Sequence, residues 1–209
     1  MGRHIAGIIL AGGRSSRMGG GDKTLLALGD GTLLDRVVSR LGPQVGPLAL
    51  NANGDPARFA ATGLPVLADT VKGYAGPLAG ILTGLEWAFD TTCQALVTAA
   101  GDTPFLPRDM VERLLAAADE RPGAIAVACS GGKRHPTFAL WPLSSGQVLR
   151  QFLVEEDNRR VSAFIDRHGF VEVEFPILKS GGAEIDPFFN INTPDDLAQA
   201  AHLLQSIEP

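Results

Sequence analysis

Short runs of apolar residues alternate along the chain with longer segments in which apolar positions recur every three or four residues. Ile5–Leu10 and Ala95–Ala100 are two such runs, and each is followed by a loop that contains glycine. Uninterrupted apolar runs of this length are typical of strands buried on both faces of a parallel sheet. Shorter strands are predicted at 47–50, 65–67 and 124–129.

Helical periodicity is clearest in the segment 32–41. Its apolar positions are Leu33, Leu34, Val37, Val38 and Leu41. This spacing places them on one face of a helix. Proline is favoured in the first turn of a helix, so Pro77 is predicted to begin a helix that continues through Phe89. Further helices are predicted near 56–61 and from Pro107 through Leu115.

The alternation of strands and helices predicts an α/β fold with three layers, in which helices cover both faces of a mostly parallel sheet. Folds of this class bind ligands at the carboxyl ends of the strands. The two loops that carry the most candidate chemistry follow Leu10 and Ala100. Both are therefore expected at this edge of the sheet.

The second half of the chain has a different pattern. The segments 136–141 and Phe170–Phe175 are predicted strands, the second one half-exposed, and 161–167 is a predicted short helix. A last helix, to about Leu204, begins at Thr193 with a cap, a proline in its first turn and an acidic third position. We find no repeat or linker, so the prediction is a single domain, 1–209, with a C-terminal elaboration.

Composition excludes several classes of partner. The formal net charge is −5 and no basic stripe is present, which argues against a nucleic-acid partner. The two cysteines, Cys93 and Cys129, form no CxxC pair, and the histidines are scattered, so neither a disulfide framework nor a structural zinc site is predicted. No apolar run is long enough to span a membrane, and the start is too short for a signal peptide. We expect a cytoplasmic protein.

The segment from Leu10 to Lys23 is the most informative in the chain. Five of its fourteen residues are glycine, and two arginines and a lysine lie among them. Glycine allows backbone N–H groups to approach an anion, while arginine and lysine neutralise phosphate. A P-loop is excluded because Asp22 precedes Lys23, and the G-x-G-x-x-G dinucleotide motif is absent. The alternative is a flexible, solvated surface loop.

This segment resembles the signature Leu-Ala-Gly-Gly, Arg-Met-Gly, Asp-Lys of nucleotidyltransferases with a Rossmann-like core. More specifically, the chain resembles the molybdenum cofactor guanylyltransferase family along almost its whole length. The further matching motifs are Asn51-Ala52-Asn53, Gly76-Pro77-Leu78-Ala79-Gly80, Gly101-Asp102-Thr103-Pro104, His135-Pro136-Thr137 and Asn190-Ile191-Asn192-Thr193-Pro194. The first motif alone is shared by the whole superfamily, and the combination indicates the guanylyltransferases.

The resemblance implies a role for each matching position. Guanine and ribose would be bound by Asn51, Asp69 and the backbone of Leu10, Ala11, Gly12 and Gly13. Arg17 and Lys23 would contact the triphosphate, and Asp102 would hold Mg²⁺, for which Mn²⁺ can substitute. The nucleotide would lie on the N-terminal half, about 1–104, and the acceptor on the C-terminal half, about 105–209.

Each of these residues also has a purely structural interpretation. Asp102 could begin a turn at Pro104, Asn51 and Asn53 could form strand-end turns, and Asp69 could cap a loop. The segment 76–80 could be only a helix start. Two basic patches either bind the acceptor or are only solvated faces. One consists of Lys133, Arg134 and His135, and the other of Asn158, Arg159 and Arg160. Asn190 and Asn192 either lie near the metal and acceptor or only cap the last helix.

The resemblance therefore implies a transferase that attaches GMP from GTP to molybdopterin or Mo-molybdopterin and releases pyrophosphate. Further implied partners are molybdenum cofactor biosynthesis proteins and acceptor molybdoenzymes. Transfer of CMP to molybdopterin, or of a cytidylyl or uridylyl group to a sugar or alcohol phosphate, remains an alternative. A different class is a nucleotide-binding regulatory subunit without catalysis, which the presence of Arg17, Lys23 and Asp102 disfavours.

Overall fold

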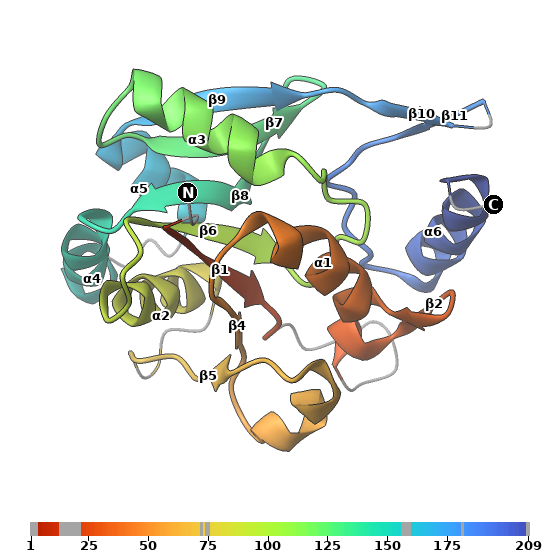
Figure 1. Cartoon of the computed structure of the whole chain (residues 1–209), viewed down its shortest axis with the longest axis horizontal. Helices are drawn as coiled ribbons and strands as arrows, with labels where there is room; N and C mark the ends of the chain where they lie inside the picture. The colour runs from red at the N-terminus through yellow and green to blue at the C-terminus, as the bar shows by residue number, and fades with distance from the viewer. Residues whose placement is uncertain are drawn as a thin grey trace.

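The computed structural model of the chain describes residues 4–12, 22–71, 73, 76–155, 160–180 and 182–207. Within these residues, seven strands form a central sheet in the order β5-β4-β1-β6-β8-β7-β9 (Figure 1). The strands are β1 (Ile5–Leu10), β4 (Leu48–Asn51), β5 (Val66–Leu67), β6 (Ala95–Ala100), β7 (Ile125–Ser130), β8 (Lys133–Pro142) and β9 (Phe170–Phe175). Two hairpins lie outside this sheet, β2 (Ala27–Leu28) with β3 (Gly31–Thr32) and β10 (Leu178–Ser180) with β11 (Ala183–Ile185).

The central sheet is mostly parallel, as predicted. Strand β8 alone runs antiparallel to its neighbours β6 and β7, and the other neighbouring strands pair in parallel. The start of β8 therefore lies at the same edge of the sheet as the carboxyl ends of the remaining strands. This edge gathers the loops after β1, β4 and β6 together with the turn between β7 and β8.

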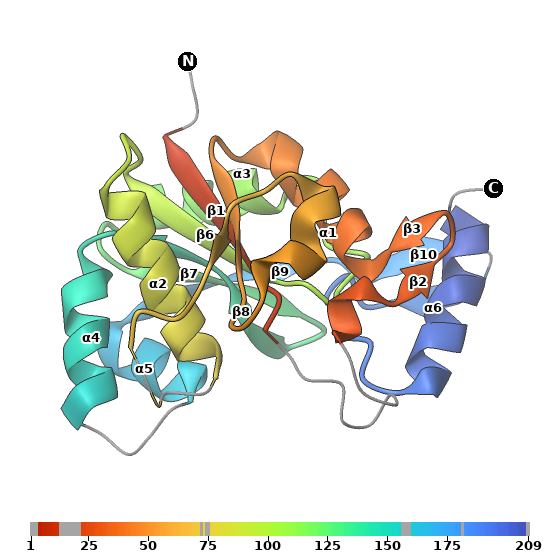
Figure 2. The ribbon, with the colours of Figure 1, turned by 90° about the horizontal axis from the view of Figure 1, so that it is seen from below.

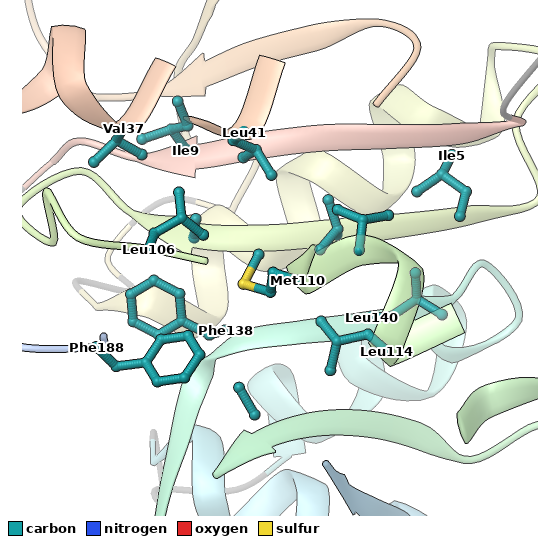
Figure 3. Close-up of a cluster of buried hydrophobic side chains, with 14 of the residues drawn as sticks. Ile5, Ile9, Val37, Leu41, Leu106, Met110, Leu114, Phe138, Leu140 and Phe188 are labelled. Atoms are coloured by element: carbon teal, nitrogen blue, oxygen red, sulfur yellow. The ribbon is translucent and has the colours of Figure 1, made fainter. Parts of the chain in front are cut away.

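Helices cover both faces of the sheet (Figures 1 and 2). They are α1 (Leu33–Leu41), α2 (Pro77–Phe89), α3 (Met110–Glu120), α4 (Ser145–Glu155), α5 (Val161–His168) and α6 (Pro194–Ile207), with 3₁₀ turns η1 (Lys23–Leu25), η2 (Gly42–Gln44) and η3 (Pro56–Thr62). Successive residues of a strand point to opposite faces. Accordingly Ile5 and Ile9 of β1 pack in the core under α1 and α3, shown in Figure 3, while Ala6 and Ile8 pack under α2, α4 and α5.

A third apolar cluster joins the last helix to the β2–β3 hairpin and the start of α1. Leu28 and Leu33 pack with Phe105, Ile185 and the inner face of α6, including Leu204. Helix α6 lies beside the β2–β3 hairpin in Figure 2. The C-terminal part of the chain is thereby held next to the segment that follows the glycine-rich loop. None of the helices among these described residues is both long enough and apolar enough to cross a membrane.

Two helices differ from the sequence-based expectation. Helix α3 begins at Met110 rather than Pro107, because the buried side chain of Gln44 donates to the carbonyl of Pro107 and accepts from the backbone N–H of Val111. That pair of hydrogen bonds replaces the first helical turn. Helix α4 was not predicted, although Leu149, Phe152 and Leu153 are buried at helical spacing.

Candidate active site

The loops after β1, β4 and β6 are tied together at the carboxyl edge by backbone hydrogen bonds. The N–H of Ala11 donates to the carbonyl of Asn51 at 2.9 Å, and the N–H of Gly101 donates to the carbonyl of Leu10 at 3.0 Å. A Cβ at position 101 would lie 2.8 Å from the methyl group of Thr24. Glycine is therefore required for the loop after β6 to approach the segment that carries Lys23.

The first polar cluster at this edge consists of Asn51, Asn53 and Asp69, and we call it the amide–carboxylate cluster. Asn51 Nδ2 donates to Asp69 Oδ1 at 2.9 Å, and Asn53 Nδ2 donates to Asp69 Oδ2 at 2.8 Å. Asn53 Oδ1 accepts in return from the backbone N–H of Asp69 at 2.9 Å. Each carboxylate oxygen retains a further acceptor position, because a carboxylate has about four lone-pair sites.

Helix α2 approaches this cluster with its N-terminal turn. A Cβ on Gly80 would lie 2.1 Å from Asn51 Oδ1 and 2.9 Å from Cδ2 of Leu10. Gly76 precedes the helix with φ of 142°, a conformation that favours glycine, and Pro77 occupies the first turn. The segment 76–80 therefore does begin a helix, and its glycine at position 80 also leaves room for the Asn51 side chain.

The second polar cluster consists of Lys23, Asp102 and Asn192, and we call it the lysine–carboxylate cluster. Lys23 Nζ donates to Asp102 Oδ2 at 2.5 Å and to Asn192 Oδ1 at 2.7 Å. The side chains of Lys23 and Asp102 are only 12% and 18% exposed, so solvent screens this ion pair less than it screens a surface pair. The cluster joins the segment after the glycine-rich loop, the end of β6 and the segment before α6.

Asn190 and Ile191 complete the contact between the last segment and the loop after β6. Asn190 Oδ1 accepts from Thr103 Oγ1 at 2.8 Å, and the N–H of Ile191 donates to the carbonyl of Asp102 at 3.0 Å. The side chain of Ile191 is fully buried. Asn190 and Asn192 therefore lie at the same site as Asp102 and Lys23. The sequence had left open whether they lie there or only cap the last helix.

The start of α6 fixes Asn192 from the other side. Asp196 accepts from the backbone N–H groups of Asn192 and Thr193, both at 2.8 Å, and Thr193 Oγ1 accepts from the N–H of Asp196. These contacts, first among them the hydrogen bond from Asn192, hold the pKa of Asp196 below its ordinary value. The predicted cap at Thr193 is thus present, and it also orders the residue that contacts Lys23.

The remaining predicted site residues divide into two groups. Leu10, Ala11 and Gly12 lie at the end of β1 beside Asn51, whereas Gly13 and Arg17 lie outside the described residues, as do Asn158 and Arg159. Arg134 bonds Asp166 at 2.6 Å and its guanidinium lies over the ring of Phe170, so its side chain supports α5 and β9. The contributions of Thr103 and Gly80 could be found only from the structure.

The donor set of the lysine–carboxylate cluster fits a small, hard cation. Mg²⁺ binds oxygen ligands and commonly takes only one or two protein carboxylates. Asp102 supplies a carboxylate, and Asn190 and Asn192 bring amide oxygens to its neighbourhood. Within the part of the chain that the structure describes, no group of three or more His, Cys, Asp or Glu side chains could hold a metal ion.

The chain has helices on both faces of a mostly parallel sheet with two polar clusters at its carboxyl edge, and comparison with known families identifies it as a nucleotidyltransferase. Residues 7–171 match the model of the MobA-like NTP transferase domain. The molybdenum cofactor guanylyltransferase of Mesorhizobium japonicum is 70% identical over 99% of both chains, and that of a Bradyrhizobium species is 49% identical over 95% of this chain and 92% of its own. The chain belongs to the molybdenum cofactor guanylyltransferases within the MobA-like family.

The fold is shared with a solved structure of low sequence identity. The molybdopterin-guanine dinucleotide biosynthesis protein A from Archaeoglobus fulgidus superposes with a TM-score of 0.73 at 22% identity. The match covers 96% of this chain and 98% of the other. At that identity the superposition establishes the Rossmann-like fold, and the sequence relatives establish the family.

Proposed function

We propose that this chain transfers GMP from GTP to the terminal phosphate of molybdopterin or Mo-molybdopterin and releases pyrophosphate. The observation that carries the proposal is the meeting of Lys23, Asp102 and Asn192 at the carboxyl edge, next to the amide–carboxylate cluster. Full-length relatives named molybdenum cofactor guanylyltransferase support the choice of donor and acceptor.

The nucleoside is assigned to the amide–carboxylate cluster. Asn51 and Asn53 hold both oxygens of Asp69, so the carboxylate is oriented before a nucleotide binds. A carboxylate can accept from ribose hydroxyls or from the N1–H and exocyclic amine of guanine. A preorganised acceptor pair discriminates against a base without matching donors, because the unpaired acceptors would remain buried.

The phosphates are assigned to the lysine–carboxylate cluster. Lys23 would neutralise charge on the triphosphate, and Arg17 is proposed to assist it. Asp102, with the amide oxygens of Asn190 and Asn192 nearby, would hold Mg²⁺ or Mn²⁺. The cation would supply charge neutralisation between the nucleotide phosphates and the attacking phosphate. Nucleotidyl transfer depends chiefly on such positioning and neutralisation, and an ionised phosphate needs no general base.

The acceptor is assigned to the C-terminal half, about 105–209, and the nucleotide to the N-terminal half, about 1–104. Asn190 and Asn192 support this division, because they bring the C-terminal half to the reacting phosphates. Lys133 is exposed near the same edge, at the start of β8. We further propose that the reaction takes place in the cytoplasm and that the product passes to molybdoenzymes. The two free, buried cysteines are consistent with a reducing compartment.

The decisive experiment offers GTP, CTP, ATP and UTP separately with molybdopterin and Mg²⁺. Pyrophosphate release and the mass of the product are recorded for each nucleotide. GTP is expected to give the fastest release and a product heavier by one GMP. Turnover of CTP equal to or faster than that of GTP would replace the proposal with cytidylyl transfer, and no release with any nucleotide would favour a regulatory, non-catalytic protein.

A further inference from the structure

Ser130, His135 and Asp186 form a hydrogen-bonded group that the proposed reaction does not use. Ser130 ends β7 and His135 lies near the start of β8, and they are only 3% and 7% exposed. Ser130 Oγ lies 2.7 Å from His135 Nε2 and 2.7 Å from Asp186 Oδ1. We call these three residues the Ser–His–Asp cluster.

The direction of these hydrogen bonds follows from the number of available protons. A carboxylate can only accept, so the single hydroxyl hydrogen of Ser130 is donated to Asp186. His135 Nε2 must then carry a hydrogen and donate it to Ser130 Oγ. Burial lowers the pKa of His135, against the opposing charge of Asp186, so the ring is neutral at pH 7 with its hydrogen on Nε2.

This arrangement is not that of a nucleophilic triad. In a triad the histidine accepts from the serine and the carboxylate binds the far side of the histidine ring. Here the serine lies between the other two residues, is buried, and donates to the carboxylate. The cluster is therefore suited to holding Asp186 in place rather than to attacking a substrate.

Asp186 in turn fixes a tight turn. Its Oδ1 accepts from the N–H of Phe188 at 2.9 Å, and its carbonyl accepts from the N–H of Phe189 at 3.0 Å. The ring centroid of Phe188 lies 4.7 Å from that of His135. It lies 4.9 Å from that of Phe138, and these two phenylalanine rings are seen side by side in Figure 3. Polar and aromatic contacts from β7 and β8 thus hold the turn from two sides.

The turn leads directly into the active site. Only three residues separate Asp186 from Asn190, and Asn190 and Asn192 then contact Thr103 and Lys23. Strand β8 also pairs with β6, since Thr98 lies opposite Ala139 and its hydroxyl donates to the carbonyl of Thr137. A shift at Asp186 would therefore be passed on to Asn190 and Asn192.

We propose that Ser130, His135 and Asp186 are positioning residues that set the place of Asn190 and Asn192 beside Asp102 during transfer. The inference rests on the proposed function, because it assigns Asn190 and Asn192 to the reacting phosphates. It adds residues of β7, β8 and the turn after β11 that act through the segment before α6 rather than by contact with substrate.

The test compares two substitutions of His135. His135→Gln keeps an N–H near the position of Nε2, whereas His135→Met keeps the bulk and removes the donor. We expect His135→Met to lower kcat by about tenfold or more, the effect of leaving a buried polar partner unsatisfied. His135→Gln should recover most of this loss. The KM for GTP should stay within about twofold in both, because the amide–carboxylate cluster does not contact this group.

A second pair of substitutions makes the test independent of His135. Asp186→Asn keeps an oxygen that can accept from Ser130 and Phe188, and Asp186→Ala removes it, so Asp186→Ala should lower kcat more. GTP affinity by calorimetry and thermal unfolding are measured for all four variants. Equal kcat in the members of both pairs, or kcat and GTP affinity falling together, would overturn the positioning role. A wild-type protein that releases no pyrophosphate would instead overturn the proposed function.

Discussion

The two polar clusters at the carboxyl edge are assembled over very different distances along the chain. Asn51 and Asp69 in the amide–carboxylate cluster are 18 positions apart and belong to neighbouring strands and their loops. In the lysine–carboxylate cluster, Lys23 is 79 positions from Asp102 and 169 positions from Asn192. The first cluster therefore depends on one local unit, and the second depends on the fold of nearly the whole chain.

This difference implies a separation between binding and transfer. The amide–carboxylate cluster is built from the unit of β4, β5 and the start of α2. The hydrogen bonds described for it involve no residue of the C-terminal half. The lysine–carboxylate cluster exists only when α6 and the segment before it dock beside the loop after β6. Substitutions that weaken the docking of the C-terminal half should therefore lower kcat more than they lower nucleotide affinity.

The largest effect is expected from Asp102→Asn. The amide keeps the size of the side chain but removes the negative charge that pairs with Lys23 and would hold a cation. We expect kcat to fall by about 10³-fold, while GTP affinity measured by calorimetry changes only a few-fold. Wild-type turnover that persists after chelation of divalent cations would contradict the metal role of Asp102.

Lys23→Ala should have the next largest effect. Loss of one phosphate-facing charge typically lowers turnover by about 10²–10³-fold. Asn192→Ala should act through the same contact, so the double variant should lose less than the product of the two single losses. Strict additivity in kcat would show that Lys23 and Asn192 act separately during the reaction.

Gly80→Ala should damage the amide–carboxylate cluster selectively. The added Cβ would lie 2.1 Å from Asn51 Oδ1 and would displace that side chain. We expect the KM for GTP to rise by about 10–100-fold, with a smaller change in kcat. Gly146→Ala in α4 is the matched control, because its Cβ would meet Leu85 at an ordinary 3.5 Å. Similar kinetics for both variants would argue against the role of Asn51.

Asp69→Asn tests what the amide–carboxylate cluster recognises. Both oxygens of Asp69 accept from asparagine amides, so an amide at this position places one donor against another. We expect the preference for GTP over CTP, measured as the ratio of kcat/KM for the two nucleotides, to fall by about tenfold, because the acceptor pair that matches the guanine donors is lost. An equal loss for both nucleotides would instead show that Asp69 binds the ribose or only orders the cluster.

The smallest effect concerns the cap that orders Asn192. Asp196→Asn should lower the free energy of unfolding by about 1 kcal/mol at pH 7, as measured by urea titration. Because folding depresses the pKa of Asp196, its contribution is complete above the unfolded value and is lost as pH falls through the folded value. The difference between wild type and variant should therefore shrink at acid pH. A difference that grows on acidification would contradict this assignment.

Much of the framework could be predicted from local pattern. The apolar runs at Ile5–Leu10 and Ala95–Ala100, the proline that begins α2 and the cap at Thr193 are local signals, and each element is present. Because Asp102 and the Leu10 loop both follow predicted parallel strands, the pattern also predicts that they lie at one edge of the sheet. Helix α4 has no clear starting signal in the sequence. Helix α3 begins later than Pro107 indicates, because the side chain of Gln44, distant in sequence, replaces its first turn.

The alternation of strands and helices, the carboxyl-edge loops and the residue types that phosphate chemistry needs can all be inferred from the order of residues along the chain. Three features depend on the packing of distant segments: Lys23 contacts both Asp102 and Asn192, Gly80 makes room for Asn51, and Ser130, His135 and Asp186 meet. Periodicity fixes which face of an element is buried, because it reflects backbone geometry. Which side chains contact one another at the carboxyl edge of the sheet depends on the strand order and on the docking of α6. Both arise only when the whole chain packs.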